Sequence, residues 1–240
     1  MIYAVLGDIH GNLHAFDAVV GDIDEAGADR VLCVGDVVGY GAYPRECIEM
    51  VTEIDALSVA GNHDWAAIGK VSVDYFNADA RDSIRWTREQ LNDGDVEFLT
   101  QKELLLTLDE ITLTHSTPFS PEYFDYMQTL YDVQLAFDHL TTRICFCGHS
   151  HVPAMFVDSD PIGFFLKPEH RILPEQRMIV NVGSVGQPRD LDPRACYVLY
   201  DSDEQKVYMR RVEYDIHSAS ESIAQAGLPA TNAARLVLGR

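Results

Sequence analysis

Long hydrophobic runs are missing from this sequence of 240 residues. No apolar stretch approaches the roughly 18 residues that a membrane-spanning helix needs. The apolar residues 2–6 have no basic leader before them, so they predict a first β-strand rather than a signal peptide. We therefore expect a cytoplasmic protein without a membrane partner.

Basic residues are scarce as well. Lys and Arg number 18 against 38 Asp and Glu, which gives a net charge of −20 at pH 7. A surface this negative repels nucleic-acid phosphates and anionic lipids, so the charge argues against non-specific nucleic-acid binding and against a nuclease. Hydrophobic residues make up 47% and charged residues 23%, which is typical of globular proteins and excludes intrinsic disorder.

Cysteine is too rare and too irregularly spaced for a secreted disulfide framework, because there are only five. Cys33, Cys145 and Cys196 lie within apolar, strand-like runs, which predicts buried small hydrophobic side chains. The pair Cys145 and Cys147 has a spacing that also suits metal binding, but the alternation of a strand explains it at least as well.

Repeats, low-complexity tracts and linkers are absent, so we expect a single domain over residues 1–240. The first third predicts strands at 2–6, 31–34 and 56–60 with amphipathic helices between them. Each of these strands ends in glycine followed by a polar residue. In open α/β sheets, such carboxyl ends of strands form the functional crevice.

The rest of the chain predicts a mixed α/β domain. A helix over 78–91 ends at Asn92-Asp93-Gly94, and a helical tail over 218–238 breaks at Gly227-Leu228-Pro229. Further strands are predicted at 104–108, 111–114, 144–147, 154–157, 178–182, 196–200 and 207–212. An aromatic segment at about 117–140 directly follows His115, so it is the best candidate for a cap over a substrate.

Short polar clusters follow five of the predicted strands. A single aspartate at such a place more often caps a helix or turn than binds a ligand. Together, however, the clusters carry four histidines, two aspartates and an asparagine at strand ends, where the fold brings them close. These residues are Asp8, His10, Asp36, Asn62, His115, His149 and His151.

The donor types of this set suit divalent transition metals. Carboxylate, imidazole and amide groups favour Mn, Fe, Zn, Co or Ni over a calcium site built of oxygens. Seven ligands are too many for one metal that keeps a solvent position, but they suffice for two metals sharing a carboxylate. Two divalent ions about 3.5–4 Å apart are a recurring solution for phosphoryl chemistry.

In this order the clusters resemble the motifs of the calcineurin-like metallophosphoesterase superfamily, over residues 8–151. The resemblance implies a four-layer α/β/β/α sandwich with a dinuclear metal centre at the carboxyl ends of the strands. It implies that Asp8, His10, Asp36 and His151 bind the first metal. Asp36 would bridge to the second metal, whose other ligands would be Asn62, His115 and His149.

His63 matches the family histidine that contacts the phosphate and protonates the leaving oxygen. The neighbouring Asp64 is interpreted either as a group that orients His63 or as an ordinary surface carboxylate. The implied mechanism is in-line attack by a metal-bridging hydroxide without a covalent phospho-enzyme. Manganese is the favoured metal.

Differences from the motifs of other superfamily members indicate which subfamily this chain resembles. Protein serine/threonine phosphatases carry Asp-Arg-Gly where this chain has Gly39-Tyr40-Gly41. That stretch and residues 181–189 resemble instead the small bacterial and archaeal phosphodiesterase-like branch. Tyr40 and Arg189 are candidate substrate contacts. Alternatively, Tyr40 packs in the interior, and the glycine-rich residues 183–189 form a turn that packs under the metal site.

The sequence therefore predicts a metal-dependent phosphodiesterase or phosphatase that acts on small phosphorylated molecules, with nucleotides as plausible substrates. One alternative is a dinucleoside polyphosphate hydrolase, and another is a non-catalytic metal-binding interaction scaffold. His63 together with a full ligand set favours an enzyme, because a scaffold has little reason to keep both. A homo-oligomer is compatible with the sequence.

Overall fold

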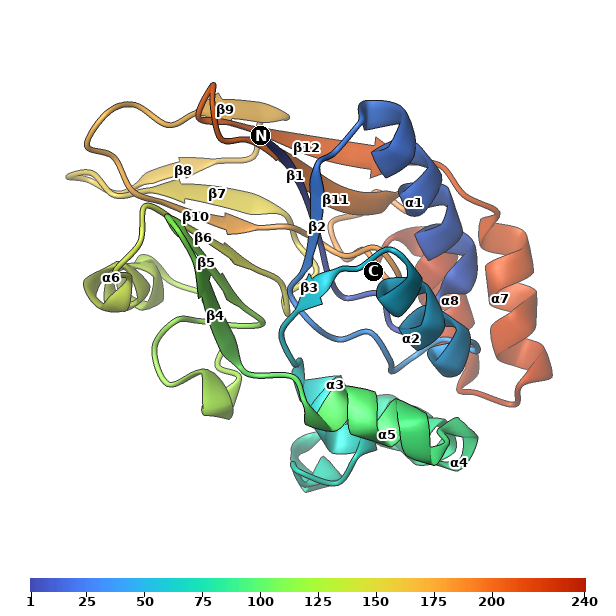
Figure 1. Cartoon of the computed structure of the whole chain (residues 1–240). Coiled ribbons are helices and arrows are strands. Elements are labelled where there is room, and N and C mark those ends of the chain that lie inside the picture. Colours follow the sequence, from blue (N-terminus) through green and yellow to red (C-terminus); the bar gives the residue numbers. More distant parts are fainter.

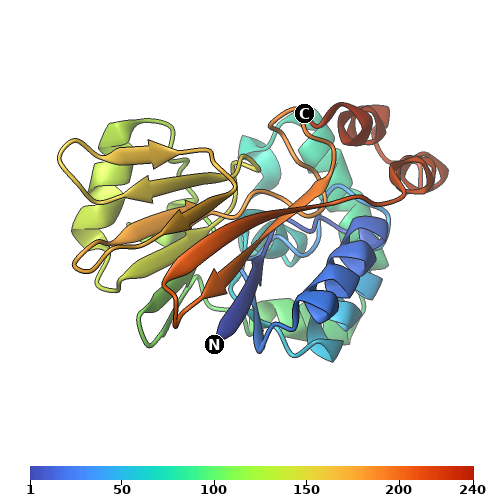
Figure 2. The same cartoon turned by 90° about the horizontal axis from the view of Figure 1, so that it is seen from above.

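The computed structural model describes residues 1–240 and contains two six-stranded β-sheets that lie face to face (Figures 1 and 2). The first sheet consists, in spatial order, of β3 (Leu57–Ser58), β2 (Arg30–Cys33), β1 (Ile2–Leu6), β11 (Ala195–Asp201), β12 (Lys206–Val212) and β9 (Glu169–Arg171). The second consists of β4 (Leu105–Leu108), β5 (Ile111–Thr114), β6 (Ile144–Cys147), β10 (Met178–Asn181), β7 (Ala154–Val157) and β8 (Gly163–Phe165).

Each sheet contains three neighbouring parallel strands. In the first sheet these are β1, β2 and β3, and Cys33 pairs with Leu6 on one side and with Ser58 on the other. In the second sheet they are β5, β6 and β10. Because parallel strands share a direction, the loops that follow them start from the same edge of their sheet.

Helices cover the outer faces of both sheets. The first sheet packs against α1 (Leu13–Ala26), α2 (Pro44–Glu53) and α5 (Asp93–Thr100) through side chains such as Phe16, Val51 and Leu99. The second packs against α6 (Leu130–His139), whose Phe137 lies in one apolar cluster with Cys145 and Cys147. Figure 2 shows α6 and the α1 side on opposite flanks of the paired sheets. The predicted four-layer α/β/β/α sandwich is confirmed.

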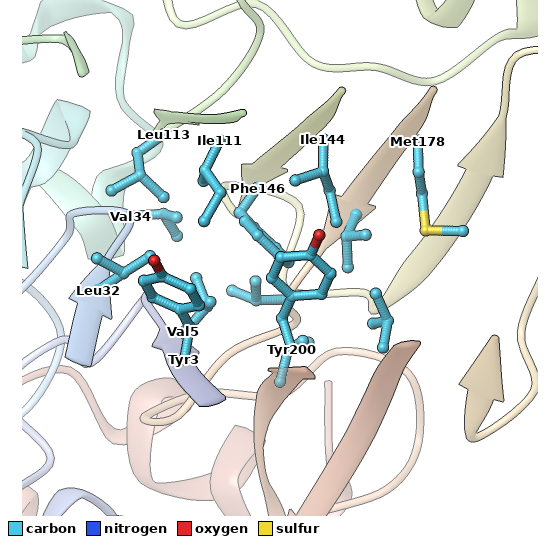
Figure 3. Close-up of a cluster of buried hydrophobic side chains, with 14 of the residues drawn as sticks. Tyr3, Val5, Leu32, Val34, Ile111, Leu113, Ile144, Phe146, Met178 and Tyr200 are labelled. Carbon is cyan, nitrogen blue, oxygen red and sulfur yellow. The ribbon is translucent and has the colours of Figure 1, made fainter. Parts of the chain in front are cut away.

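The main hydrophobic core lies between the two sheets (Figure 3). Tyr3 and Tyr200 come from the first sheet, and Phe146 and Met178 come from the second. The rings of Phe146 and Tyr200 meet with centroids 5.7 Å apart. Full burial of such a side chain contributes about 1.5–3 kcal/mol, so this core holds the two sheets, and the loops at their edges, in a fixed relation.

The remaining helices are α3 (Asn62–Ala67), α4 (Ala78–Gln90), α7 (Ile216–Gln225) and α8 (Ala230–Leu238). The predicted strand over 56–60 is shorter than expected, and α3, α5 and the three-residue strands β8 and β9 were not predicted. Residues 92–94 do end α4, but Asn92 at once caps α5, since Asn92 and Asp95 exchange backbone-to-side-chain hydrogen bonds. None of the helices has the length and apolar character needed to cross a bilayer.

All five cysteines are buried free thiols. Cys145 and Cys147 pack as small apolar side chains against α6, in a layer separate from the polar clusters. Burial raises the pKa of the Cys145 thiol to about 12, so it stays protonated. This environment favours the interpretation as hydrophobic residues over that of a metal-binding pair.

Candidate metal centre

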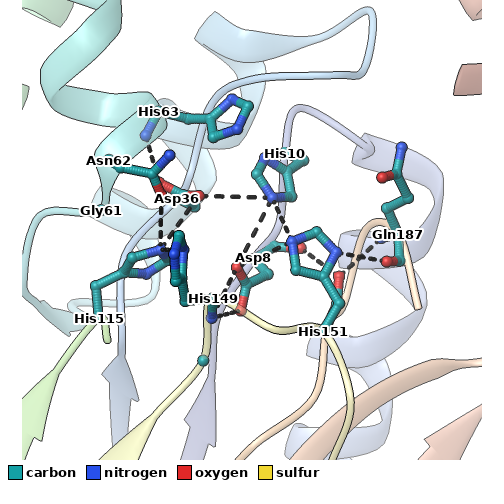
Figure 4. Close-up of polar contacts among 12 residues, drawn as sticks. Asp8, His10, Asp36, Gly61, Asn62, His63, His115, His149, His151 and Gln187 are labelled. Atoms are coloured by element: carbon teal, nitrogen blue, oxygen red, sulfur yellow. Dashed lines mark hydrogen bonds and ion pairs between the residues drawn. The ribbon is translucent and has the colours of Figure 1, made fainter. Parts of the chain in front are cut away.

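The loops after β1, β2, β3, β5 and β6 bring all seven predicted ligands into one cluster (Figure 4). Asp8 and His10 follow β1, and Asp36 follows β2. Asn62 opens α3 directly after β3, whereas His115 follows β5. His149 and His151 follow β6. Apart from Asn62, these side chains are buried.

One group in the cluster consists of Asp8, His10 and His151. Asp8 Oδ1 lies 3.3 Å from His151 Nε2 and 3.7 Å from His10 Nε2. The two imidazole Nε2 atoms are 3.0 Å apart. Two donors that each sit about 2.1 Å from one metal, at a right angle, are separated by about 3.0 Å. These three side chains therefore fit around a single ion.

A second group surrounds His115. Its Nε2 atom lies 3.1 Å from Asn62 Oδ1, 3.1 Å from His149 Nδ1 and 3.3 Å from Asp36 Oδ2. These separations again match donors that converge on one ion. The group combines imidazole, amide and carboxylate donors, as the sequence predicted for the second metal.

Asp36 joins the two groups through one oxygen atom. Its Oδ2 lies 3.6 Å from His10 Nε2 and 3.3 Å from His115 Nε2. Its other oxygen, Oδ1, accepts a hydrogen bond from the His63 backbone N–H at 2.8 Å. The arrangement suits a carboxylate that bridges two divalent ions and is fixed in orientation from its far side.

Backbone carbonyl groups set the tautomer of three of these histidines. A carbonyl oxygen only accepts, so a ring nitrogen beside it carries the proton and leaves Nε2 free to bind a metal. The pairs are His10 Nδ1 with Val38 O at 3.2 Å, His115 Nδ1 with Val34 O at 2.9 Å, and His151 Nδ1 with Gln187 O at 2.6 Å. His149 is turned the other way: its Nδ1 faces His115, and its buried Nε2 has no hydrogen-bond partner.

The backbone at the cluster is strained. Five of the seven predicted ligands have positive φ, a region that non-glycine residues rarely occupy outside functional sites. They are Asp8 (50°), His10 (51°), Asp36 (53°), His149 (69°) and His151 (59°). Glycines let the carboxylates come this close: a Cβ on Gly61 would overlap Asp36 Oδ1, and one on Gly148 would overlap Asp8 Oδ2.

Two predicted ligands already have the charge state that metal binding requires, and a third must lose a proton. Burial alone would raise the pKa of Asp36, but the neighbouring His115 and His63 outweigh it and hold that pKa well below its usual range. Burial lowers the pKa of His149 to about 3. Asp36 is therefore ionised and His149 is neutral at physiological pH, as ligands must be. Burial would lower the pKa of His115, but the carboxylate of Asp36 outweighs it and raises that pKa to about 9, so a metal would displace this proton on binding.

His63 lies at the edge of the cluster, where a nitrogen of its ring comes within 4.8 Å of the donor atoms of His10 and Asp36, and its ring packs among other rings. Its centroid is 4.7 Å from that of His10, 4.6 Å from that of Tyr40 and 5.1 Å from that of Phe76. Burial lowers the pKa of His63 to about 4, and Asp36 offsets this only in part. The buried Nδ1 of His63 has no hydrogen-bond partner.

Asp64 differs from both expectations for it. It is buried rather than a surface carboxylate, and it makes no hydrogen bond to His63. Its Oδ2 accepts the backbone N–H groups of Asp36 and Gly61 at 2.8 and 3.0 Å, and its Oδ1 accepts that of Val38 at 3.1 Å. Asp64 thus ties the loop after β2 to the start of α3, which positions the backbone of Asp36 instead of the ring of His63.

Tyr40 is only 5% exposed, because its ring packs between the rings of His10 and His63. This favours the packing interpretation over a stacking surface for a substrate. The guanidinium of Arg189 lies over the Tyr40 ring, 5.5 Å from its centroid, and donates to Gln187 Oε1 at 2.8 Å.

The glycine-rich turn before Arg189 supports Asp8. Ser184 Oγ and the Gly186 N–H both donate to the Asp8 carbonyl, at 2.8 and 2.9 Å. The carbonyl of Gln187 accepts from His151, as described above. The turn therefore packs under the metal site, which is the alternative considered for it, and it carries Arg189 to the edge of the cluster.

Two neighbours of the cluster were not predicted from the sequence. The ring of Tyr126 stacks on that of His149, with centroids 4.0 Å apart and an interplanar angle of 21°. Asn181 donates to the Gly148 carbonyl at 2.6 Å and to Ser150 Oγ at 3.0 Å, which braces the loop after β6. The only feature of the sequence that pointed to a role for Tyr126 near the site was its position in the aromatic segment after His115.

A cavity of about 650 Å³ opens beside the cluster on the side of His63. Its lining includes Tyr40, Asn62, His63, Phe76, Tyr126 and His149. A small molecule in this cavity would contact both His63 and the second group of predicted ligands.

Comparisons with known proteins agree with this geometry. The profile of the calcineurin-like phosphoesterase superfamily domain matches residues 1–205. An uncharacterised protein of Methanocaldococcus jannaschii is 39% identical over 242 residues, which cover 99% of this chain and 98% of that protein. The crystal structure of a metallophosphoesterase from Sphaerobacter thermophilus is 37% identical, with a TM-score of 0.89 over 100% of this chain and 99% of that one. A hypothetical protein from Pyrococcus horikoshii, 20% identical, shares the fold, with a TM-score of 0.82 over 100% of this chain and 98% of that one.

Proposed function

Because the chain belongs to the calcineurin-like phosphoesterase superfamily and is thus a hydrolase of phosphoric esters, we propose that it hydrolyses small phosphorylated molecules as a phosphodiesterase or phosphatase. Nucleotides are the substrates that we favour. The observation that carries this proposal is the convergence of two ligand groups on Asp36 Oδ2, with His63 beside them.

The residues present fit two divalent metal ions. Asp8, His10 and His151 would hold one ion, Asn62, His115 and His149 would hold the other, and Asp36 would serve both. Bound there, such ions supply Lewis acidity toward phosphoryl oxygens and make water a better nucleophile at neutral pH. We favour manganese, since the ligand set is rich in oxygen and imidazole.

His63 is suited to donate a proton to the leaving oxygen. Burial keeps the pKa of His63 low in the free site, but a phosphate at hydrogen-bond distance brings negative charge that raises this pKa. The ring is held between Tyr40 and Phe76, so little reorganisation is needed for proton transfer. Arg189 at the edge of the cluster is our candidate for a contact to a phosphoryl oxygen.

Hydrolysis assays on metal-reconstituted protein test the proposal. Purified protein is stripped of metal, supplied with one divalent metal at a time, and assayed on p-nitrophenyl phosphate, bis(p-nitrophenyl) phosphate and diadenosine tetraphosphate. We expect metal-dependent hydrolysis that His115→Ala abolishes. The exposed His217 provides a matched control, because His217→Ala removes an imidazole outside the cluster. Activity that needs no metal, or that survives His115→Ala, would contradict the proposal, and a dominant rate on diadenosine tetraphosphate would favour the polyphosphate hydrolase.

A further inference from the structure

A second, apolar pocket lies directly beyond His149. Its volume is about 340 Å³. It is formed by the segment 125–133, by the loop after β6, and by strands β7 and β8. Its apolar lining includes Met127, Leu130, Val133, Val152, Phe156 and Phe164.

Tyr126 and His149 stand between this pocket and the larger cavity. Both residues line both spaces, and their rings are stacked on each other. His63 lines only the larger cavity. Because His149 lines both, the second group of predicted ligands borders two differently lined spaces, and only one of them is lined by the predicted proton donor.

The apolar pocket also has unpaired polar atoms in its wall. Ser116 and His149 both line it and are 3% and 7% exposed. Neither Ser116 Oγ nor His149 Nε2 has a hydrogen-bond partner. Leaving such buried groups unpaired is costly, so the geometry suits a ligand with oxygen atoms next to an apolar body.

The volume limits the size of that apolar body. Small-molecule pockets range from about 300 to 1,000 Å³, and a cavity of about 150 Å³ already holds a benzene ring. A pocket of about 340 Å³ therefore accommodates an aryl group, a nucleobase or a short branched alkyl group.

We propose that this pocket binds the substituent that a phosphodiester substrate retains after hydrolysis, an inference that rests on the proposed function. Water adds to phosphorus, the bond from phosphorus to the leaving oxygen breaks, and that oxygen takes up a proton on the His63 side. The second ester bond stays intact, with its apolar group beyond His149. The enzyme is thus a phosphodiesterase that releases monoesters of apolar or aromatic alcohols.

A substrate series with one leaving group tests this assignment. The compounds are p-nitrophenyl phosphate, methyl p-nitrophenyl phosphate and phenyl p-nitrophenyl phosphate, all of which release p-nitrophenolate. Because a phenyl group buries far more apolar surface than a methyl group, kcat/KM for the phenyl diester should exceed that for the methyl diester by about ten-fold or more.

Substitutions at the rim of the pocket locate the effect. Leu130 and Leu166 line the pocket but are 56% and 68% exposed, so Leu130→Asp and Leu166→Asp should fold normally. Each variant places a carboxylate beside the apolar substituent and should lower kcat/KM for the phenyl diester to the value for the methyl diester. Leu173 is 54% exposed and lies outside the pocket, so Leu173→Asp should leave the ratio of the two kcat/KM values, phenyl over methyl diester, unchanged.

A binding measurement separates this inference from the proposed function. Phenylphosphonate and methylphosphonate are titrated into the metal-loaded protein by calorimetry, and we expect about ten-fold tighter binding of phenylphosphonate that Leu130→Asp removes. Equal rates for the two diesters, with equal binding of the two phosphonates, would overturn the inference. If no ester is hydrolysed but phenylphosphonate binds preferentially, the proposed function is wrong, and the pocket binds the apolar group of a phosphoryl ligand that is not a substrate.

Discussion

Replacing Asp64 should weaken the fold rather than selectively disable proton transfer. Its carboxylate accepts three buried backbone N–H groups, from Asp36, Val38 and Gly61. In Asp64→Asn, the amide oxygen can replace Oδ2 and keep two of these bonds, but the amide NH₂ then faces the Val38 N–H. One buried donor left unpaired costs about 1–3 kcal/mol, a large part of a typical stability of about 5–15 kcal/mol.

Urea unfolding of the metal-free protein measures this loss, and kcat on good and poor leaving groups measures the chemical effect. We expect a lower unfolding midpoint, with a rate defect that is the same for both kinds of ester. Asp17 is exposed on α1, so Asp17→Asn is the matched control and should change neither quantity. Unchanged stability combined with a selective loss on poor leaving groups would refute this reasoning and restore Asp64 as a partner of His63.

Three further substitutions have distinct expected outcomes. His63→Ala should retain both metals, measured by elemental analysis, and lower kcat about 10²–10⁴-fold. The loss in kcat should be larger for alkyl esters than for nitrophenyl esters, whereas loss of metal would show that His63 is a ligand. Asp36→Asn removes the charge shared by the two groups, so bound Mn²⁺ should fall from two equivalents towards one or none, and near-normal turnover would mean that Asp36 does not bridge. Asp22 is held by hydrogen bonds from Arg210 and from Tyr197, which lower its pKa. This stabilisation is fully present above the unfolded pKa of about 4 and is lost as the pH falls through the lower pKa of the folded state. Asp22→Asn should therefore destabilise the protein by about 1–3 kcal/mol at pH 7 and by progressively less as the pH is lowered below about 4. A loss in the free energy of unfolding that does not shrink in acid would contradict this.

The elements that could be predicted from the sequence are those with a strong local signal. The strand over 2–6 combines an apolar run with a polar end, and it is found as β1. Helix α5 was not predicted because Asn92, Asp93 and Gly94 are typical turn residues, and only the capping bonds to Asp95 turn them into a helix start. Strands β8 and β9 have three residues each, too few for any periodicity to be visible.

At the site, the sequence predicted which side chains gather but not how they are supported. Every predicted ligand follows the end of a strand, and this position explains why the side chains come together. The role of Asp64 depends on two backbone N–H groups in the loop after β2, some 26 to 28 residues away in the chain, which no local pattern of residue types encodes. Likewise, Tyr126 meets His149 only because the segment 117–140 folds back over the second sheet (Figure 1), so the pocket beyond His149 has no signature in the sequence.

The predicted ligands are divided between the two sheets, which ties metal binding to the packing of the core. Asp8 and Asp36 follow strands of the first sheet, whereas His115 and His149 follow strands of the second. The backbone N–H of His149 donates to Asp8 Oδ2 at 3.0 Å, so ligands from the two sheets are in direct contact through the polypeptide alone. Ions held by both sheets bind only when the sheets are packed, and a ligand that binds only the native state stabilises it. The inter-sheet core and the metal centre therefore stabilise each other, although no side chain belongs to both.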